Sequence, residues 1–238
     1  AYQDAGADMI FAEALADESA ETGLIPRGRL RLAAPLTFAT RWLGPVLPQF
    51  LSTYPDIELE LTLSDRRTDL IGEGLDGALR ISDLPDSSLT ARRLAPVCQL
   101  VVAAPAYWAR RGIPTHPQEL SAHTCFRYAN LPTAGVWRFV GPKGEDLRVP
   151  IAGPLCVDNW DVELPSLIAG LGVARLPVFI VHHAIVAGQL TPVLADWRGP
   201  NLVLHLLTPP GRSQHRPMRA LSDFLHLHFG GGRAPWLA

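Results

Sequence analysis

Shortages of cysteine and of net charge narrow the classes of protein to which this sequence can belong. Its 238 residues contain three cysteines, and such a sparse, odd set does not build the disulfide framework of a small secreted domain. All three stand in apolar surroundings, where we expect buried free thiols in a reducing compartment, most simply the cytoplasm. The net charge is −2, whereas a free-standing nucleic-acid-binding domain carries a basic face. We therefore do not expect this stretch of chain to bind DNA by itself.

Long apolar runs are also missing. No stretch reaches the roughly eighteen consecutive apolar residues of a transmembrane helix, so we expect no contact with a membrane. Residues 1–22 are acidic and lack the basic start and apolar core of a signal peptide. They predict a helix with few apolar residues to bury, so an interaction arm and a frayed tail both remain open. The first residue is Ala1 rather than methionine, which indicates a piece of a longer protein.

Familiar catalytic motifs are lacking as well. The sequence has no G-x-S-x-G, H-E-x-x-H or Walker motif, so we do not expect an enzyme. Its two histidine pairs are poorly spaced for metal binding: His182 and His183 are adjacent, and His226 and His228 lie two apart. Paired ligands on a helix are instead four residues apart. We predict neither a metal site nor a cofactor.

The apolar residues that are present follow strand and helix periodicities in turn, which predicts an α/β protein. Residues 29–34, 57–63 and 77–81 predict strands, separated by helices over 38–54 and 68–73. This β-α-β-α-β order favours a parallel sheet with helices on its faces. Further strands are predicted over 100–103, 125–128, 136–140, 147–149, 155–157, 172–176, 190–194 and 203–207. Further helices are predicted over 105–112, 160–170, 179–187 and 218–229.

Several segments, in order and with their spacing, resemble the effector-binding domain of LysR-type transcriptional regulators. The segment 75–81 (LDGALRI) is similar to the family's DLAIRIG strand, with Gly77 in place of an apolar residue, and 169–177 (AGLGVARLP) resembles its AGLGIALLP segment. The other matching segments are 28–35 (GRLRLAAP), 43–50 (LGPVLPQF), 54–57 (YPDI), 86–89 (DSSL), 92–94 (RRL), 105–108 (PAYW) and 188–194 (GQLTPVL). The resemblance as a whole runs from about Gly28 to Phe229.

The resemblance implies a type 2 periplasmic-binding-protein-like fold, in which two α/β lobes flank a cleft and are joined by two crossover strands. We place the crossings near 100–103 and 201–205. Lobe I then comprises 28–101 and 205–232, and lobe II comprises 102–204. Residues 1–27 would be the end of a linker helix and a linker.

The resemblance also implies partners and a location. A small-molecule effector would bind in the cleft and control transcription. Promoter DNA would be bound only through an N-terminal helix-turn-helix that this sequence does not contain. The protein would form a homodimer or homotetramer in the cytoplasm. The alternative is a secreted solute-binding protein of the same fold, whose mature chain would also lack a signal peptide.

In open α/β sheets, ligands bind beyond the carboxyl ends of the strands, where helix N-termini offer N–H groups and positive partial charge to a carboxylate. In lobe I the first such turn contains Thr37 and Phe38, and the second contains Ser64 and Asp65. The hydroxyl of Thr37 can cap its helix or donate to a ligand, and the second turn has the same ambiguity. We predict all four as effector-binding residues.

The third strand of lobe I ends at Arg80 and Ser82. There the guanidinium would point towards the cleft mouth and suit a carboxylate, although it would alternatively pair with Asp83 or Asp86.

In lobe II, Asn159 and Trp160 precede a helix and offer a hydrogen-bond donor and a flat apolar wall. Core packing is the alternative for the indole. Asn130, after the strand through Tyr128, completes the predicted set.

Overall fold

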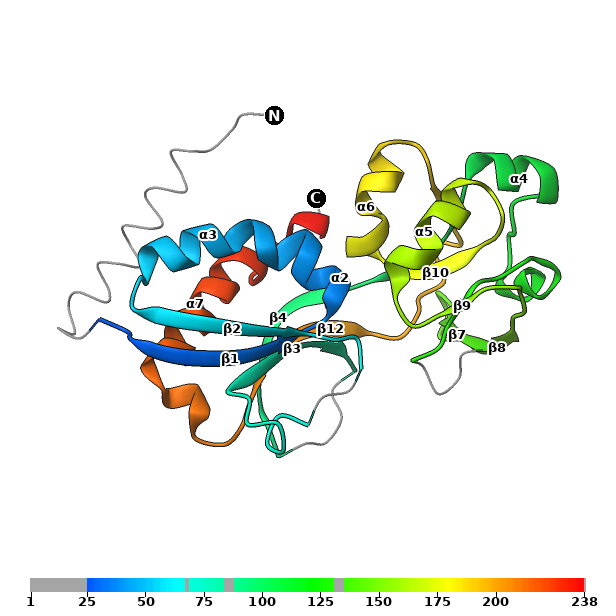
Figure 1. Ribbon diagram of the computed structural model, residues 1–238. Helices are drawn as coiled ribbons and strands as arrows, with labels where there is room; N and C mark the ends of the chain where they lie inside the picture. The colour runs from blue at the N-terminus through cyan, green and yellow to red at the C-terminus, as the bar shows by residue number, and fades with distance from the viewer. Residues whose placement is uncertain (1–24, 67–68, 84–87, 131–134, 238) are drawn as a thin grey trace.

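The computed structural model describes residues 25–66, 69–83, 88–130 and 135–237, which form two α/β lobes joined side by side (Figure 1). The helix predicted over 1–22 lies outside the described residues. The first lobe contains a five-stranded sheet in the order β2-β1-β3-β12-β4. Its strands are β1 (Gly28–Ala34), β2 (Ile57–Leu63), β3 (Gly77–Ser82), β4 (Thr90–Val97) and β12 (Leu202–Thr208).

Strand β1 is buried on both faces of the sheet at its carboxyl end. It pairs in parallel with β2 and β3, while β12 pairs antiparallel with β3 and β4. Alternate side chains of a strand point to opposite faces. Leu30 and Leu32 therefore enter the main core, whereas Ala33 packs in a smaller cluster with Leu70 and Leu75. Burial on both faces accounts for the apolar carboxyl end of β1, whereas β2 and β4 keep exposed polar residues.

Helices cover the main face of the sheet. Residues 36–53 form one helical segment made of α2 (Leu36–Phe38), a π-helical turn (Ala39–Leu43) and α3 (Gly44–Thr53). Helix α7 (Arg216–Phe229) packs beside it, and Phe50 of α3 contacts Phe224 of α7 with ring centroids 5.2 Å apart. The helices predicted from apolar spacing over 38–54 and 218–229 are confirmed.

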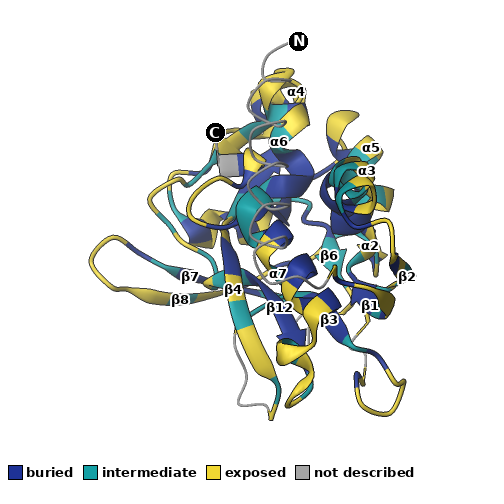
Figure 2. Ribbon diagram, turned by 90° about the vertical axis from the view of Figure 1, so that its left-hand side faces the viewer, coloured by how far each residue is buried: buried dark blue, intermediate teal, exposed yellow. Residues whose placement is uncertain are grey.

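The second lobe is built around a three-stranded sheet in the order β10-β5-β11. The three strands of this sheet are β5 (Gln99–Ala103), β10 (Ala174–Pro177) and β11 (Thr191–Val193). Two further pairs of strands belong to the lobe: β6 (Arg127–Tyr128) with β9 (Cys156–Val157), and β7 (Val136–Val140) with β8 (Asp146–Pro150). The helices of the second lobe are α4 (Pro105–Arg111), α5 (Trp160–Ile168) and α6 (Val178–Val186). The turn between β7 and β8 protrudes from the lobe and is exposed (Figure 2).

The lobes are connected where β4 continues into β5 through Cys98, and where the chain returns from β11 to β12 through Pro200. The predicted lobe boundaries, at 101/102 and 204/205, fall inside β5 and β12. Strand β5 pairs only within the second sheet and β12 only within the first, as far as the described residues show. We therefore propose to divide the lobes at Cys98 and Pro200.

Two expectations for the first lobe are wrong. Residues 70–74 form a turn instead of continuing a helix, because the Asp69 carboxylate accepts hydrogen bonds from the N–H groups of Ile71 and Gly72. Residues 72–77 have the sequence spacing G-x-G-x-x-G. A dinucleotide-binding loop with this spacing follows a strand and opens a helix, whereas this segment leads into strand β3, so it does not form such a loop. Strand β4 was not predicted. It lies at the edge of the sheet, where Pro96 is tolerated.

The cysteines also differ from expectation. Cys125 is buried, and burial raises the pKa of its thiol to about 12, but Cys98 and Cys156 are exposed. All three are free, as predicted. In the described part of the chain, no helix combines the length and the apolarity that a membrane crossing requires.

Gly77 provides a test of the packing in the first lobe. A Cβ at this position would lie 3.0 Å from the carbonyl oxygen of Leu207 and 3.0 Å from Cε of Met218. We expect Gly77→Ala to lower the free energy of unfolding by about 1–3 kcal/mol, measured by urea denaturation, because both neighbours must move. Gly135→Ala is the matched control, since no atom lies within 4 Å of its Cβ position. Equal stability of the two variants would contradict this packing.

Candidate functional site between the lobes

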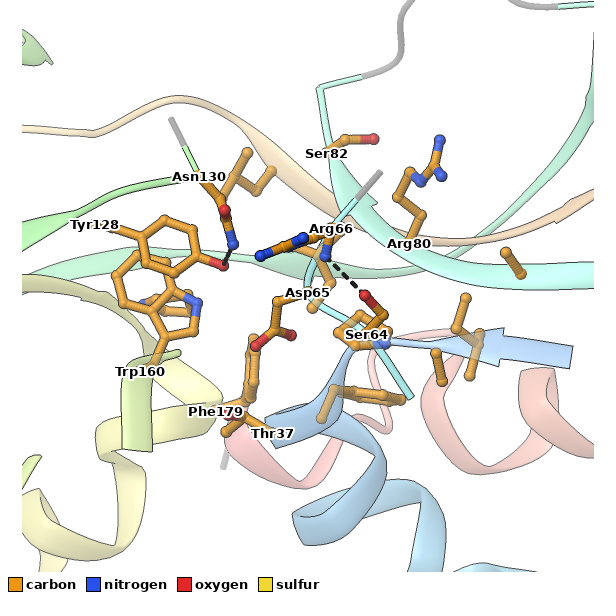
Figure 3. Close-up of a pocket in the computed structure, with 18 of the residues that line it drawn as sticks. Thr37, Ser64, Asp65, Arg66, Arg80, Ser82, Tyr128, Asn130, Trp160 and Phe179 are labelled. Atoms are coloured by element: carbon orange, nitrogen blue, oxygen red, sulfur yellow. Dashed lines mark hydrogen bonds between the residues drawn. The ribbon is translucent and has the colours of Figure 1, made fainter. Parts of the chain in front are cut away.

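A cavity of about 860 Å³ lies between the two lobes (Figure 3). The parallel strands β1, β2 and β3 all end at the edge of the sheet that faces it. This is the edge at which α/β sheets place their ligands. The structure brings all the predicted site residues except Asn159 into the cavity lining: Thr37, Phe38, Ser64, Asp65, Arg80, Ser82, Asn130 and Trp160.

Asp65 occupies a position that we expected to be open to a ligand. Its Oδ1 accepts a hydrogen bond of 3.0 Å from the backbone N–H of Leu36, at the N-terminus of α2. Its Oδ2 accepts a bond of 2.8 Å from Nδ2 of Asn159, which belongs to the other lobe. The helix N-terminus expected to attract a ligand carboxylate therefore already holds a carboxylate of the protein itself.

Thr37 and Asn159 connect the lobes directly. The Thr37 hydroxyl donates to Asp161 Oδ2 at 2.8 Å, and Asn159 Nδ2 lies 3.3 Å from the same hydroxyl oxygen. Arg41 forms an ion pair with the other carboxylate oxygen of Asp161. We call Thr37, Arg41, Asp65, Asn159 and Asp161 the interlobe network. All five side chains bond across the gap, so the network joins the lobes, together with the apolar packing of α2 against α6.

Thr37 and Asn159 differ in whether their side chains cap a helix. Thr37 does not cap α2, whose N-cap is Pro35 without a side-chain bond. Asn159 does cap α5, because its Oδ1 accepts a 3.0 Å bond from the N–H of Asp161. In the second turn, Ser64 Oγ accepts a bond of 3.2 Å from the N–H of Arg66. These local bonds fix the turns at the ends of the strands.

An aromatic wall forms the second-lobe side of the cavity. The rings of Tyr128 and Trp160 are stacked, with centroids 3.6 Å apart and planes 12° apart, and Figure 3 shows them facing Asp65 and Thr37. Asn130 Nδ2 donates to the Tyr128 hydroxyl at 3.2 Å. Burial raises the pKa of Tyr128 to about 12, so this phenol is neutral at physiological pH. The indole of Trp160 packs against the core and also lines the cavity, so it takes both of the places predicted for it, in the core and at the cavity wall.

Arg80 lies at the opposite end of the cavity from Trp160 in Figure 3. It belongs to β3 and is half-buried, next to Ser82 two residues on, which also lines the cavity. Of the alternative partners predicted for it, Asp83 lines the same cavity and Asp86 lies outside the described residues.

Sequence reasoning missed five polar residues of the cavity lining: Arg66, Asp83, Gln99, Tyr128 and Arg175. Arg175 is 7% exposed, and its guanidinium carbon lies 5.4 Å from the ring centroids of both Trp137 and Phe139. Burial lowers its pKa to about 10, so it stays protonated at neutral pH. The available signal was a charged residue inside the apolar strand 173–177, where AGLGIALLP has leucine.

The histidines considered for metal binding pack against aromatic rings. His183 is stacked on Trp42 with centroids 5.5 Å apart, and His228 lies 4.3 Å from Phe224 by the same measure. Within the described ranges, no group of three or more His, Cys, Asp or Glu side chains is arranged to hold a metal ion.

Known proteins resemble this chain along nearly its whole length. Residues 25–230 match the family model for the LysR substrate binding domain. The probable HTH-type transcriptional regulator LtrA of Klebsiella pneumoniae is 30% identical over 94% of this chain and 73% of its own length. An HTH-type transcriptional regulator of Xanthomonas campestris is 34% identical over 84% of this chain and 59% of its own length.

Solved structures agree with these sequence relatives. CrgA, a LysR-type transcriptional regulator from Neisseria meningitidis, has a TM-score of 0.78 at 27% identity, over 94% of this chain and 77% of that one. Its regulatory domain alone has a TM-score of 0.74, with 86% of this chain and 100% of that one covered. AphB of Vibrio cholerae, described as a virulence activator, has a TM-score of 0.75 at 26% identity, over 94% and 76% of the two chains.

Glu163 of α5 lies behind the aromatic wall and makes stability depend on pH. It is 1% exposed, and neither carboxyl oxygen has a hydrogen-bond partner, so burial raises its pKa from 4.5 to about 8. A raised carboxyl pKa means that the folded state binds the proton more tightly than the unfolded state. The free energy of unfolding is therefore undiminished below the pKa that Glu163 has in the unfolded chain. It falls as the pH rises from there towards the pKa of Glu163 in the folded protein.

We expect Glu163→Gln to unfold at higher denaturant concentration than the parent at pH 8, with a gain of about 2–4 kcal/mol that shrinks towards pH 5. Urea denaturation at both pH values measures this. Glu58→Gln, which changes an exposed side chain near the start of β2, is the matched control and should show no such pH dependence. A gain that does not change with pH would contradict the protonated state of Glu163.

Proposed function

This chain belongs to the LysR substrate-binding domain family, and from that premise we propose that it senses a small organic effector in the cavity between its lobes. The type 2 periplasmic-binding-protein-like fold predicted from the sequence is confirmed by the regulatory domains that it resembles. The relatives named above are transcriptional regulators, which gives no support to the alternative of a secreted solute-binding protein.

The rest of the regulator is proposed from the same relatives. The chain spans 73% of one of them and 59% of another, and both are HTH-type regulators. We infer that the full-length protein binds promoter DNA through an N-terminal helix-turn-helix and works in the cytoplasm. A homodimer or homotetramer would carry the change of arrangement from this sensor to the DNA, and no catalytic step is required.

The observation that carries the sensor proposal is the polar contact between lobes beside a cavity. Thr37 and Asp65 bond to Asp161 and Asn159 across the gap. A ligand in the cavity touches groups of both lobes, so its affinity depends on how the lobes are placed. Only such a difference in affinity between two arrangements can shift their populations.

The charges that line the cavity favour an effector with a carboxylate. Three arginines line it, Arg66, Arg80 and Arg175, against the two aspartates Asp65 and Asp83. Arginine binds carboxylates with paired, fixed N–H donors. The stacked rings of Tyr128 and Trp160 supply a flat surface for an apolar part of the ligand.

The sensor proposal is tested with Thr37→Ala and Asn159→Ala. A set of small organic acids and neutral compounds is first screened for stabilisation of the chain against heat, and the affinity of any ligand found is measured by calorimetry. We expect each substitution to lower the affinity for that ligand about tenfold, which corresponds to about 1.4 kcal/mol, because the side chain that is removed makes hydrogen bonds beside the cavity. The circular dichroism spectrum should be unchanged.

Thr40→Ala is the matched control for Thr37→Ala. Its hydroxyl bonds only to the carbonyl oxygens of Leu36 and Thr37 in its own helix, and Thr40 is exposed. Ligand affinity should be unaffected. If Thr37→Ala and Asn159→Ala both bind the ligand as tightly as the parent, the effector does not bind beside the interlobe network.

A further inference from the structure

We propose that Arg175 and Gln99 form a subsite at the base of the cavity for a 2-hydroxycarboxylate that carries an apolar substituent. This inference rests on the proposed function, because it assigns the ligand chemistry of the same cavity. It goes further by naming the anchor for the carboxylate, the acceptor for the hydroxyl group and the surface for the apolar part.

Arg175 is a buried cation for which the described part of the chain provides no counterion. Of its five N–H donors, the structure shows one hydrogen bond, from Nη1 to the carbonyl oxygen of Arg138 at 2.7 Å. Among the described residues it makes no ion pair, although it lines the cavity at 7% exposure. A buried charge is unfavourable unless it is paired, so a bound carboxylate would complete this site.

Gln99 supplies the complementary group. Its Oε1 is buried and has no hydrogen-bond partner, and the residue lines the same cavity. In the antiparallel pairing of β5 with β10, Arg175 is opposite Val101 and Gln99 is opposite Pro177. The two side chains are therefore diagonal neighbours on one face of the sheet. A ligand whose carboxylate binds Arg175 can place an adjacent hydroxyl where it donates to Gln99.

Gly199 leaves space beside both groups. A Cβ at this position would lie 3.1 Å from Gln99 Oε1 and 3.9 Å from Cδ of Arg175. The next residue, Pro200, also lines the cavity. The absence of a side chain at 199 keeps the region around the amide oxygen and the arginine free for a ligand.

Two other places for the carboxylate are less suitable. The N-terminus of α2 already holds Asp65, so an anion there would meet a like charge. Arg66 is exposed and Arg80 is half-buried, and both have contacts within the protein. Water screens charges at exposed sites, whereas the burial of Arg175 strengthens any hydrogen bond that it makes to an anion.

The test compares three probes that differ by one group. Mandelate has the carboxylate, the 2-hydroxyl and a phenyl ring; phenylacetate lacks the hydroxyl; mandelamide lacks the charge. Each enantiomer of mandelate is titrated into the 238-residue chain by calorimetry. We expect one enantiomer to bind about tenfold more tightly than mandelamide and about threefold more tightly than phenylacetate.

The variants separate the two contacts. Arg175→Leu, which installs the residue of AGLGIALLP, should abolish the preference for mandelate over mandelamide. It should also raise the midpoint of thermal unfolding, because an unpaired buried cation is removed. A purely structural arginine would give a lower midpoint instead.

Gln99→Leu should abolish only the preference for mandelate over phenylacetate. Arg148→Gln, which removes an exposed charge outside the cavity lining, is the matched control and should keep both preferences.

The inference is overturned if mandelate and mandelamide bind equally, if the preference survives Arg175→Leu, or if no carboxylate probe binds at about 20 mM. These outcomes differ from a failure of the sensor proposal. If a neutral compound binds and Thr37→Ala weakens it, the cavity remains the effector site and only the assignment to Arg175 and Gln99 falls.

Discussion

Two aspartate carboxylates form the centre of the polar contact between the lobes, beside the apolar packing of α6 against α2. Asp65 of the first lobe binds the N-terminus of α2 and the Asn159 amide, and Asp161 of the second lobe binds Thr37 and Arg41. These groups are only partly buried, so each bond contributes about 0.5–1.5 kcal/mol. A contact of this strength fixes one arrangement without making it permanent. A ligand with a modest preference between arrangements can therefore shift the balance.

The cavity lies beside a hydrophobic core that both lobes share, because α6 of the second lobe packs into the same cluster of buried residues as β1 and α3. In the first lobe, β1 buries Leu30 and Leu32 beneath α3 and α7, and in the second, Trp137 and Phe139 pack behind β5. Polar groups such as Gln99 Oε1 and Glu163 can then remain buried without partners at a cost in stability. Such costs concentrate at functional sites in natural proteins.

Periodicity predicted the strands and helices that are buried, and strand ends then located the cavity. Thr37 and Asp65 could be predicted because parallel strands end at one edge. Asn159 was predicted as a site residue too, but its bond to Asp65 and the bond of Thr37 to Asp161 were not, since each pair lies far apart in sequence. Strand β4 was missed because two arginines and Pro96 interrupt its alternation, which an edge strand tolerates. Arg175 was missed because its neighbours have the apolar pattern of a core strand, and its meaning depends on the side chains packed around it.

The base of the cavity is also where the lobes are connected. Gln99 is the second residue of the chain after β4, and Pro200 and Leu202 lie on the return to β12, so all three residues belong to the crossings. A ligand held there touches the segments whose backbone must rotate if the lobes move. The interlobe network lies instead on the helix side, at α2 and α5. The same lobe motion that loosens bonds at Asp65 would alter the shape around Gln99, so occupancy at one place is coupled to bonding at the other.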